Sequence, residues 1–180
     1  LNINNELKKS GYAKAIVKPS FSKKDNNISI TYNIKRNDTF SINDILISGN
    51  TKTLDTVIRR NIYVFSQDIY NYEDILDSKT SLLRTGLFET VEIEEEFLED
   101  NIINLIFTVK EKSTTVWIAG GGYSDLDGVF IDTSIEDTNT FGSGISNKIS
   151  FTLSKDNQKY IYSISNPRIF NSKYSGGFSI

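Results

Sequence analysis

The feature that most constrains the fold is an internal repeat: residues 11–35 and 86–110 share one pattern at a constant spacing of 75 positions. Within it Gly11 aligns with Gly86, and Ile16 with Val91. An alternating apolar stretch then aligns without a gap: Ile28, Ile30, Tyr32, Ile34 and Lys35 with Ile103, Leu105, Phe107, Val109 and Lys110. Because self-similarity at a fixed spacing marks a structural unit used more than once, we expect two copies of one small domain. Two unrelated hairpins of similar pattern are the alternative that the sequence leaves open.

The second copy can be followed from its first strand to its last. Residues 40–48 alternate like a strand, and apolar residues at helical spacing then predict two helices, with Thr53 and Asn71 as candidate N-caps. Residues 91–97 and 103–109 predict two more strands, the second more apolar and therefore central. The predicted order is β-α-α-β-β. The apolar residues expected on the two helices are Leu54, Val57, Ile58, Ile62 and Phe65, then Tyr72, Ile75, Leu76, Leu82, Leu83 and Leu87.

After Lys112 the helical periodicity does not return. Strands of about ten residues, each with one apolar and one polar face, are separated by short polar turns, which is the signature of a transmembrane β-barrel. A soluble β-sandwich has the same alternation, so the pattern alone leaves both architectures open. The lack of a linker and the clustered aromatic residues favour the barrel. These aromatic residues are Tyr160, Tyr162, Tyr174 and Phe178.

Three consecutive glycines, Gly120 to Gly122, lie in the first of these segments. A phosphate-binding loop would be followed by a helix whose N-terminal amides complete the anion site. Here Tyr123, a polar turn over residues 125–128 and a β-branched, alternating stretch follow instead. We therefore expect strand, turn and strand, and no nucleotide site.

Composition excludes several classes of function. The 180 residues contain no Cys and no His, which removes thiolate and imidazole metal sites and the usual catalytic triads. A carboxylate-only magnesium or calcium site is left open, although no loop has EF-hand spacing. A net charge of −3 provides no basic surface for nucleic acid. The carboxylates from Glu92 to Glu96 have no converging second group, so we expect no enzyme and no catalytic residue. We also expect no bound metal, no cofactor and no small-molecule substrate.

The complete copy resembles the POTRA domain, the periplasmic module of the Omp85 family. The segments that carry the resemblance are ILISGNTKT, LLRTGLFETVEIE and INLIFTVKEK. The resemblance implies α+β POTRA domains of order β-α-α-β-β, with the end of one at residues 1–37 and a complete, last one at 38–112. It also implies that residues 113–180 are the first strands of an incomplete antiparallel transmembrane β-barrel. Since the chain contains no Met and begins in mid-pattern, we expect it to be a fragment.

Residues 110–170 are similar to the passage from POTRA domain to barrel in the branch of the Omp85 family that assembles outer-membrane proteins. The matching pieces are Gly120 to Tyr123, Asp137 to Gly144, and Ser165-Asn166-Pro167 with Phe170. The last piece favours this branch over the related translocation-module branch, and the last two speak against a two-partner secretion pore. Those two kinds of POTRA-barrel transporter are the alternative interpretation. The pair Arg168-Ile169 departs from the family, in which an aromatic residue usually follows the proline.

The resemblance implies a central component of the outer-membrane β-barrel assembly machinery, with its barrel in the outer membrane and its POTRA domains in the periplasm. Its implied partners are unfolded outer-membrane proteins, accessory assembly lipoproteins and outer-membrane lipid. These unfolded proteins, the clients, would be inserted at the barrel seam. There the glycines weaken the pairing of the first strand, so that it separates easily and pairs with an incoming strand. A second interpretation is that the glycines only relieve crowding in a curved sheet. The predicted seam strand consists of Thr115, Val116, Trp117, Ile118, Ala119, Gly120, Gly121, Gly122 and Tyr123.

Two further sites are suggested outside the seam. By resemblance Arg59, with Arg60 beside it, would dock a partner lipoprotein, but the family's glutamate seven residues on is Ser66 here. A solvated basic helix face is the other interpretation of these arginines. The strand from Thr90 to Phe97 could bind clients at its edge, although its glutamates look more like charges that block unwanted pairing.

Overall fold

The computed structural model describes residues 3–24, 27–126 and 128–180, and forms two compact units. The first unit contains the residues up to 48 together with 61–81 and 91–109. The second contains residues 49–60, 82–90 and 110–180. Three elements contribute residues to both units: α3 (Tyr72–Arg84), β4 (Phe88–Phe97) and β5 (Ile102–Glu111).

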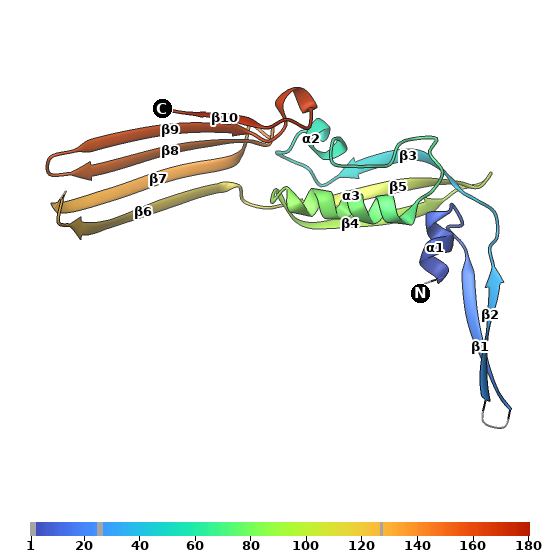
Figure 1. Cartoon of the computed structure of the whole chain (residues 1–180). Coiled ribbons are helices and arrows are strands. Elements are labelled where there is room, and N and C mark those ends of the chain that lie inside the picture. The colour runs from blue at the N-terminus through green and yellow to red at the C-terminus, as the bar shows by residue number, and fades with distance from the viewer. Residues whose placement is uncertain (1–2, 25–26, 127) are drawn as a thin grey trace. The chain divides into compact units, whose positions relative to one another are not determined.

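The first unit begins with helix α1 (Ile3–Lys9) and a hairpin of β1 (Ile16–Lys24) and β2 (Asn27–Lys35) (Figure 1). The hairpin strands are antiparallel, in a register that places Phe21 opposite Ile30. Both copies of the repeat thus form the expected strands, but the apolar face of β2 is exposed, with Ile30 51% accessible, whereas the aligned Leu105 is 0% accessible. Among the described residues the first copy has only α1 in place of the two helices and the parallel strand of the second copy.

The second copy forms a three-stranded sheet of order β3-β5-β4, in which β3 (Ser41–Ser48) runs parallel to β5. The central position predicted for β5 is confirmed. Helix α3 lies along one face of this sheet (Figure 1). The buried residues of β5 are Ile103, Leu105, Phe107 and Val109. Burying each of these apolar side chains stabilises the fold by roughly 1.5–3 kcal/mol.

The two predicted helices differ from expectation in different ways. Helix α3 begins after Asn71 as predicted, since the Asn71 Oδ1 accepts a hydrogen bond from the Glu73 amide at 3.0 Å. Ile75 and Leu82 are buried as expected, but Leu76 and Leu83 are exposed, because the buried stripe is narrower than the apolar pattern suggests.

Helix α2 (Asp55–Arg59) is much shorter than its apolar pattern predicts. The N-cap is Leu54, with no side-chain capping bond, so the prediction of Thr53 as the cap is wrong. The Thr53 amide instead donates to a carboxylate of β5. After α2 the chain makes side-chain bonds in place of helical ones, and the Tyr63 amide donates to the Ser78 hydroxyl at 2.8 Å. Tertiary partners therefore outweigh helical spacing in this segment.

The rest of the second unit is an antiparallel sheet of consecutive strands in the order β10-β9-β8-β7-β6 (Figure 1). A single 3₁₀ turn, η1 (Ile169–Asn171), precedes the last strand. The turn predicted at residues 125–128 falls between β6 and β7, and its Asp127 lies outside the described residues. The strands are β6 (Thr115–Ser124), β7 (Gly128–Thr140), β8 (Ile145–Ser154), β9 (Gln158–Asn166) and β10 (Gly176–Ser179).

This sheet has one apolar and one polar face, as the register shows. Trp117, Ile135, Ile149 and Tyr162 form one continuous row across four strands. The neighbouring row on the opposite face includes Glu136, Lys148 and Ser163. A soluble sandwich buries the apolar faces of its sheets, yet Trp117 is 73% exposed. The fold class is therefore that expected from the resemblance: an α+β POTRA region followed by an open antiparallel sheet of barrel type.

No helix among the described residues is both long and apolar enough to cross a membrane.

Candidate functional site

The predicted seam strand lies within β6, at the end of the five-stranded sheet. Its register with β7 runs without interruption from Thr115, opposite Asp137, to Ser124, opposite Gly128. No described strand pairs with the other edge of β6, and its side chains are exposed along nearly the whole strand. All nine predicted residues are thus together on one open edge, where backbone N–H and C=O groups can pair with a further strand.

The three glycines of β6 have different surroundings. A Cβ atom on Gly122 would lie 2.9 Å from Cζ of the Phe130 ring on β7, and one on Gly121 would lie 3.0 Å from the Phe130 carbonyl oxygen. A Cβ atom on Gly120 would meet nothing within 4 Å. A side chain at Gly121 would therefore crowd the β7 backbone, and one at Gly122 would have to displace the end of the Phe130 ring. Such crowding does not explain Gly120, where the glycine only weakens the strand.

The opposite half of β6 is tied to β7 by side chains. The Trp117 Nε1 donates to the Thr133 hydroxyl at 2.9 Å, and this hydroxyl is 3.2 Å from the Ile118 carbonyl oxygen, to which it donates. These bonds add to the backbone ladder between Thr115 and Ala119. Gly120, Gly121 and Gly122 can make no such bonds, because glycine has no side chain.

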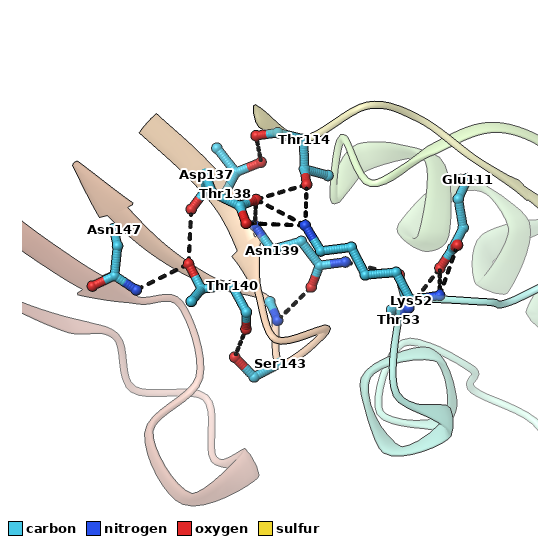
Figure 2. Close-up of polar contacts among 11 residues, drawn as sticks. Lys52, Thr53, Glu111, Thr114, Asp137, Thr138, Asn139, Thr140, Ser143 and Asn147 are labelled. Carbon is cyan, nitrogen blue, oxygen red and sulfur yellow. Dashed lines mark hydrogen bonds and ion pairs between the residues drawn. The ribbon is translucent and has the colours of Figure 1, made fainter. Parts of the chain in front are cut away.

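A polar cluster holds the residues that lead into β6 (Figure 2). We call it the junction cluster; it consists of Lys52, Thr53, Glu111, Thr114, Asp137 and Asn139. At one end the Glu111 carboxylate accepts bonds from the amides of residues 51–53, at 3.1, 2.9 and 2.6 Å, and from the Thr51 hydroxyl at 2.6 Å. Burial raises the pKa of Glu111, but these hydrogen bonds outweigh it and bring the pKa to about 2.

Lys52 joins this loop to the start of β6. Its ammonium donates to Asp137 at 3.0 Å and to the Thr114 hydroxyl at 2.9 Å, and that hydroxyl donates to Asp137 at 2.7 Å. Thr114 directly precedes β6, and Asp137 is the register partner of Thr115. The first residue pair of the seam strand is therefore fixed by a charge-assisted network.

Asn139, near the end of β7, completes the junction cluster. This buried side chain donates to the Thr53 hydroxyl at 2.8 Å and accepts from the Gly144 amide at 2.8 Å. A Cβ atom on Gly142 would lie 1.9 Å from the Lys52 carbonyl oxygen, so only glycine fits there. The motif from Asp137 to Gly144 thus packs the turn against residues 52–54 (Figure 2). The motif is recognisable in the sequence, but its partners Lys52 and Thr53 are not.

The two predicted docking arginines point to different surroundings. Arg59 is half exposed and paired with Asp55 at 2.6 Å. Arg60 is half-buried, and its guanidinium donates to the Asn171 Oδ1 at 3.3 Å. Its Nε is buried and has no hydrogen-bond acceptor among the described residues. Burial, and then the charge of Arg168, lower the pKa of Arg60. Arg59 is therefore the more accessible of the two, and its role in docking stays a prediction.

The carboxylates of the acidic strand β4 differ in their surroundings. Glu92, Glu94 and Glu96 are exposed along an edge of the sheet, and Glu95 accepts a bond from the Tyr70 hydroxyl at 2.7 Å. Among residues 3–24, 27–126 and 128–180 no group of three or more acidic side chains could hold a metal ion.

Comparisons with known proteins agree with this architecture. The family model POTRA, described as surface antigen variable number repeat, matches residues 40–112. The chain is 31% identical over 153 residues to the outer membrane protein assembly factor BamA of Neorickettsia risticii, which covers 85% of this chain and 21% of that protein. It is 29% identical over 170 residues to the BamA of Nitratidesulfovibrio vulgaris, covering 93% of this chain and 22% of that protein.

The structure is similar to the crystal structure of BamA from Haemophilus ducreyi lacking POTRA domains 1–3. The TM-score is 0.87 with 24% identity, over 98% of this chain and 34% of that one. This likeness shows the fold, and the present chain spans about a fifth of the two curated relatives by length. The chain therefore contains a POTRA domain at residues 40–112, and over most of its length it is similar to the outer membrane protein assembly factors BamA.

Proposed function

We propose that this chain is the part of an outer-membrane assembly factor that receives unfolded β-barrel proteins in the periplasm and inserts them along β6. The observation that carries the proposal is the open edge of β6 at the end of a sheet whose apolar face is exposed. A client strand added there gains a ladder of backbone hydrogen bonds, and its apolar side chains continue the apolar face of the sheet. The reaction makes and breaks no covalent bond, so the function is not enzymatic.

The position of the junction cluster suggests a direction for opening. The Thr115 end of β6 is held through Thr114 and Asp137, while Gly120 to Gly122 pair with β7 through backbone groups alone. In the proposed mechanism β6 therefore separates first at its glycine end. The client strand enters there, and pairing proceeds toward the fixed end.

The location and the remaining partners follow from the same proposal. The exposed apolar face contacts outer-membrane lipid, and the POTRA domains, at residues 1–37 and 38–112, lie in the periplasm. Residues 113–180 are the first strands of the barrel. Arg59 is proposed to contact an accessory lipoprotein, because it is the exposed member of the arginine pair.

Disulfide trapping tests the open edge directly, since this chain contains no cysteine. Ala119→Cys on β6 and Ile149→Cys on β8 both lie on the apolar face, and both residues are exposed. Of these two strands, β6 has an edge that no described strand pairs with, whereas β8 pairs with β7 and β9. In the full-length protein, a client with one cysteine in a terminal strand should form an adduct with position 119 and not with 149. Equal adducts at both positions would contradict the proposal.

Depletion separates an assembly factor from a dedicated secretion pore. If the full-length protein inserts β-barrels in general, its loss should lower the abundance of many outer-membrane proteins. The loss of a single exported protein, with the other outer-membrane proteins unchanged, would favour the secretion alternative.

A further inference from the structure

Two exposed phenylalanines lie in turns at one end of the five-stranded sheet. Phe141 follows β7 and is 91% exposed, and Phe170 follows β9 and is 98% exposed. Because consecutive strands of this sheet are antiparallel, the β7–β8 and β9–β10 turns lie at the same end (Figure 1). The start of β6 and the junction cluster belong to this end as well.

The backbone of both residues is strained. Phe141 has a φ of 52° and Phe170 a φ of 51°, in the left-handed region that costs a side-chain-bearing residue roughly 1–2 kcal/mol. Leaving a phenylalanine side chain in water forgoes roughly another 1.5–3 kcal/mol of burial. No contact within the described chain offsets these costs. A contact outside it would explain why aromatic residues occupy these positions.

The two turns are nevertheless held firmly in place. The Leu54 amide donates to the Gly142 carbonyl oxygen at 2.9 Å, next to Phe141. In the second turn the Ile169 amide donates to the Tyr174 carbonyl oxygen at 2.8 Å, and the Asn171 side chain accepts from Arg60. Both rings are therefore presented by fixed backbone.

The same end carries two guanidinium groups without an anion. Arg168 lies in the turn with Phe170 and makes no ion pair within the described part of the chain. Arg60 lies close enough for the two like charges to interact, and its Nε is buried without an acceptor. A guanidinium binds phosphate through parallel N–H···O bonds, so a phosphate between the two groups would neutralise the charge of both.

We propose that Phe141, Phe170, Arg60 and Arg168 form a lipid-binding surface that fixes this end of the sheet at the membrane interface. Membrane barrels carry girdles of aromatic residues at their interfaces, where the two phenylalanine rings would bury apolar surface, and the arginines beside them would bind lipid phosphate. The apolar row through Trp117 and Ile135 lies two residues from the Thr115–Asp137 pair at this end, so the surface lies close to the face that the proposed function assigns to lipid. The inference rests on the proposed membrane function.

Spin labels on the full-length protein in vesicles of phosphatidylethanolamine and phosphatidylglycerol test the aromatic contacts. Labels at Phe141→Cys and Phe170→Cys should collide more often with lipid-soluble oxygen than with an aqueous nickel chelate. A label at Phe65→Cys, replacing another exposed phenylalanine but in the POTRA domain, should show the reverse preference. Preference for the nickel chelate at 141 and 170, with or without partner proteins present, would overturn the proposal.

Lipid retention in native mass spectrometry tests the arginines. Arg168→Gln should reduce retained phosphatidylglycerol several-fold, whereas Lys173→Gln, which replaces an exposed cation nearby in sequence, should not. Added inorganic phosphate should displace little lipid if the site takes a headgroup; full displacement by phosphate, or equal loss in both variants, would refute it. An adduct at position 119 together with water-exposed labels at 141 and 170 would refute the lipid surface and leave the proposed function intact.

Discussion

Replacing Glu111 with glutamine should loosen the loop of residues 51–53. The carboxylate accepts from three consecutive backbone amides and from the Thr51 hydroxyl. A glutamine has the same shape and keeps one acceptor oxygen. Its NH₂ group is a donor only, so it cannot accept hydrogen bonds from the backbone N–H groups that it faces. Glu111→Gln therefore removes the charge and about half of the acceptors and leaves the packing volume unchanged.

The size of the effect follows from the pKa of Glu111, which falls from an ordinary value of 4.5 to about 2. At 1.36 kcal/mol per pKa unit this corresponds to about 3 kcal/mol, which solvent screening of a half-buried group reduces to about 1–2 kcal/mol. Because the folded pKa is depressed, this stabilisation is complete above pH 4.5 and is lost as the pH falls toward 2. Between pH 8 and 5 the loop should therefore be equally stable in the unsubstituted protein.

Hydrogen exchange of the full-length protein measures the predicted loosening. A loss of about 1–2 kcal/mol should lower the protection of amides 51–53 roughly 5–30-fold at neutral pH. Glu92→Gln is the matched control, since Glu92 is an exposed β4 carboxylate, and it should leave these amides unchanged. Unchanged protection in Glu111→Gln, or an equal change in both variants, would show that the carboxylate does not hold the loop.

Three further predictions concern the seam strand and the POTRA core. Gly122→Val should speed amide exchange along the glycine half of β6, because a Cβ at this position would lie 2.9 Å from the Phe130 ring. Gly120→Val places its side chain in open space, so it should slow this exchange and reduce the number of client adducts. Lys52→Ala should speed exchange at residues 115–118 several-fold and leave residue 123 unchanged. Phe107→Ala should cost about 3–5 kcal/mol in chemical denaturation, because this side chain is fully buried, and Phe65→Ala should change stability by less than about 0.5 kcal/mol.

The strands could be predicted from the sequence because their signal is local. Alternation of apolar and polar residues fixes which side of a strand is buried, and a register slip of one residue would exchange the faces. The buried row of β5 and the apolar face around Trp117 follow directly from this rule. The helices were harder to predict from the sequence. Phe65 and Leu76 both fit a helical apolar stripe but are exposed, because α2 ends before Phe65 and the buried stripe of α3 does not include Leu76.

The seam strand could be predicted from the sequence, but the junction cluster could not. The seam strand is one continuous segment, and its three consecutive glycines are easily recognised. The junction cluster joins Glu111 to residues 51–53 and Lys52 to Asp137, which are far apart in the sequence. Polar side chains that bond across such separations follow no local period. The motif from Asp137 to Gly144 was the one signal available, and it does not name its partners.

The two ends of β6 have opposite requirements, which explains why polar bonds and glycines are separated along the strand. A strand that templates another must open, but it must not detach from the residues that precede it. At the Thr115 end, hydrogen bonds to charged groups contribute about 1.5–3 kcal/mol each. At the other end, each glycine weakens the strand by roughly 0.5–1 kcal/mol relative to alanine. Opening at Tyr123 is therefore easier by several kcal/mol than opening at Thr115, so the same ladder can release a free edge and keep its register.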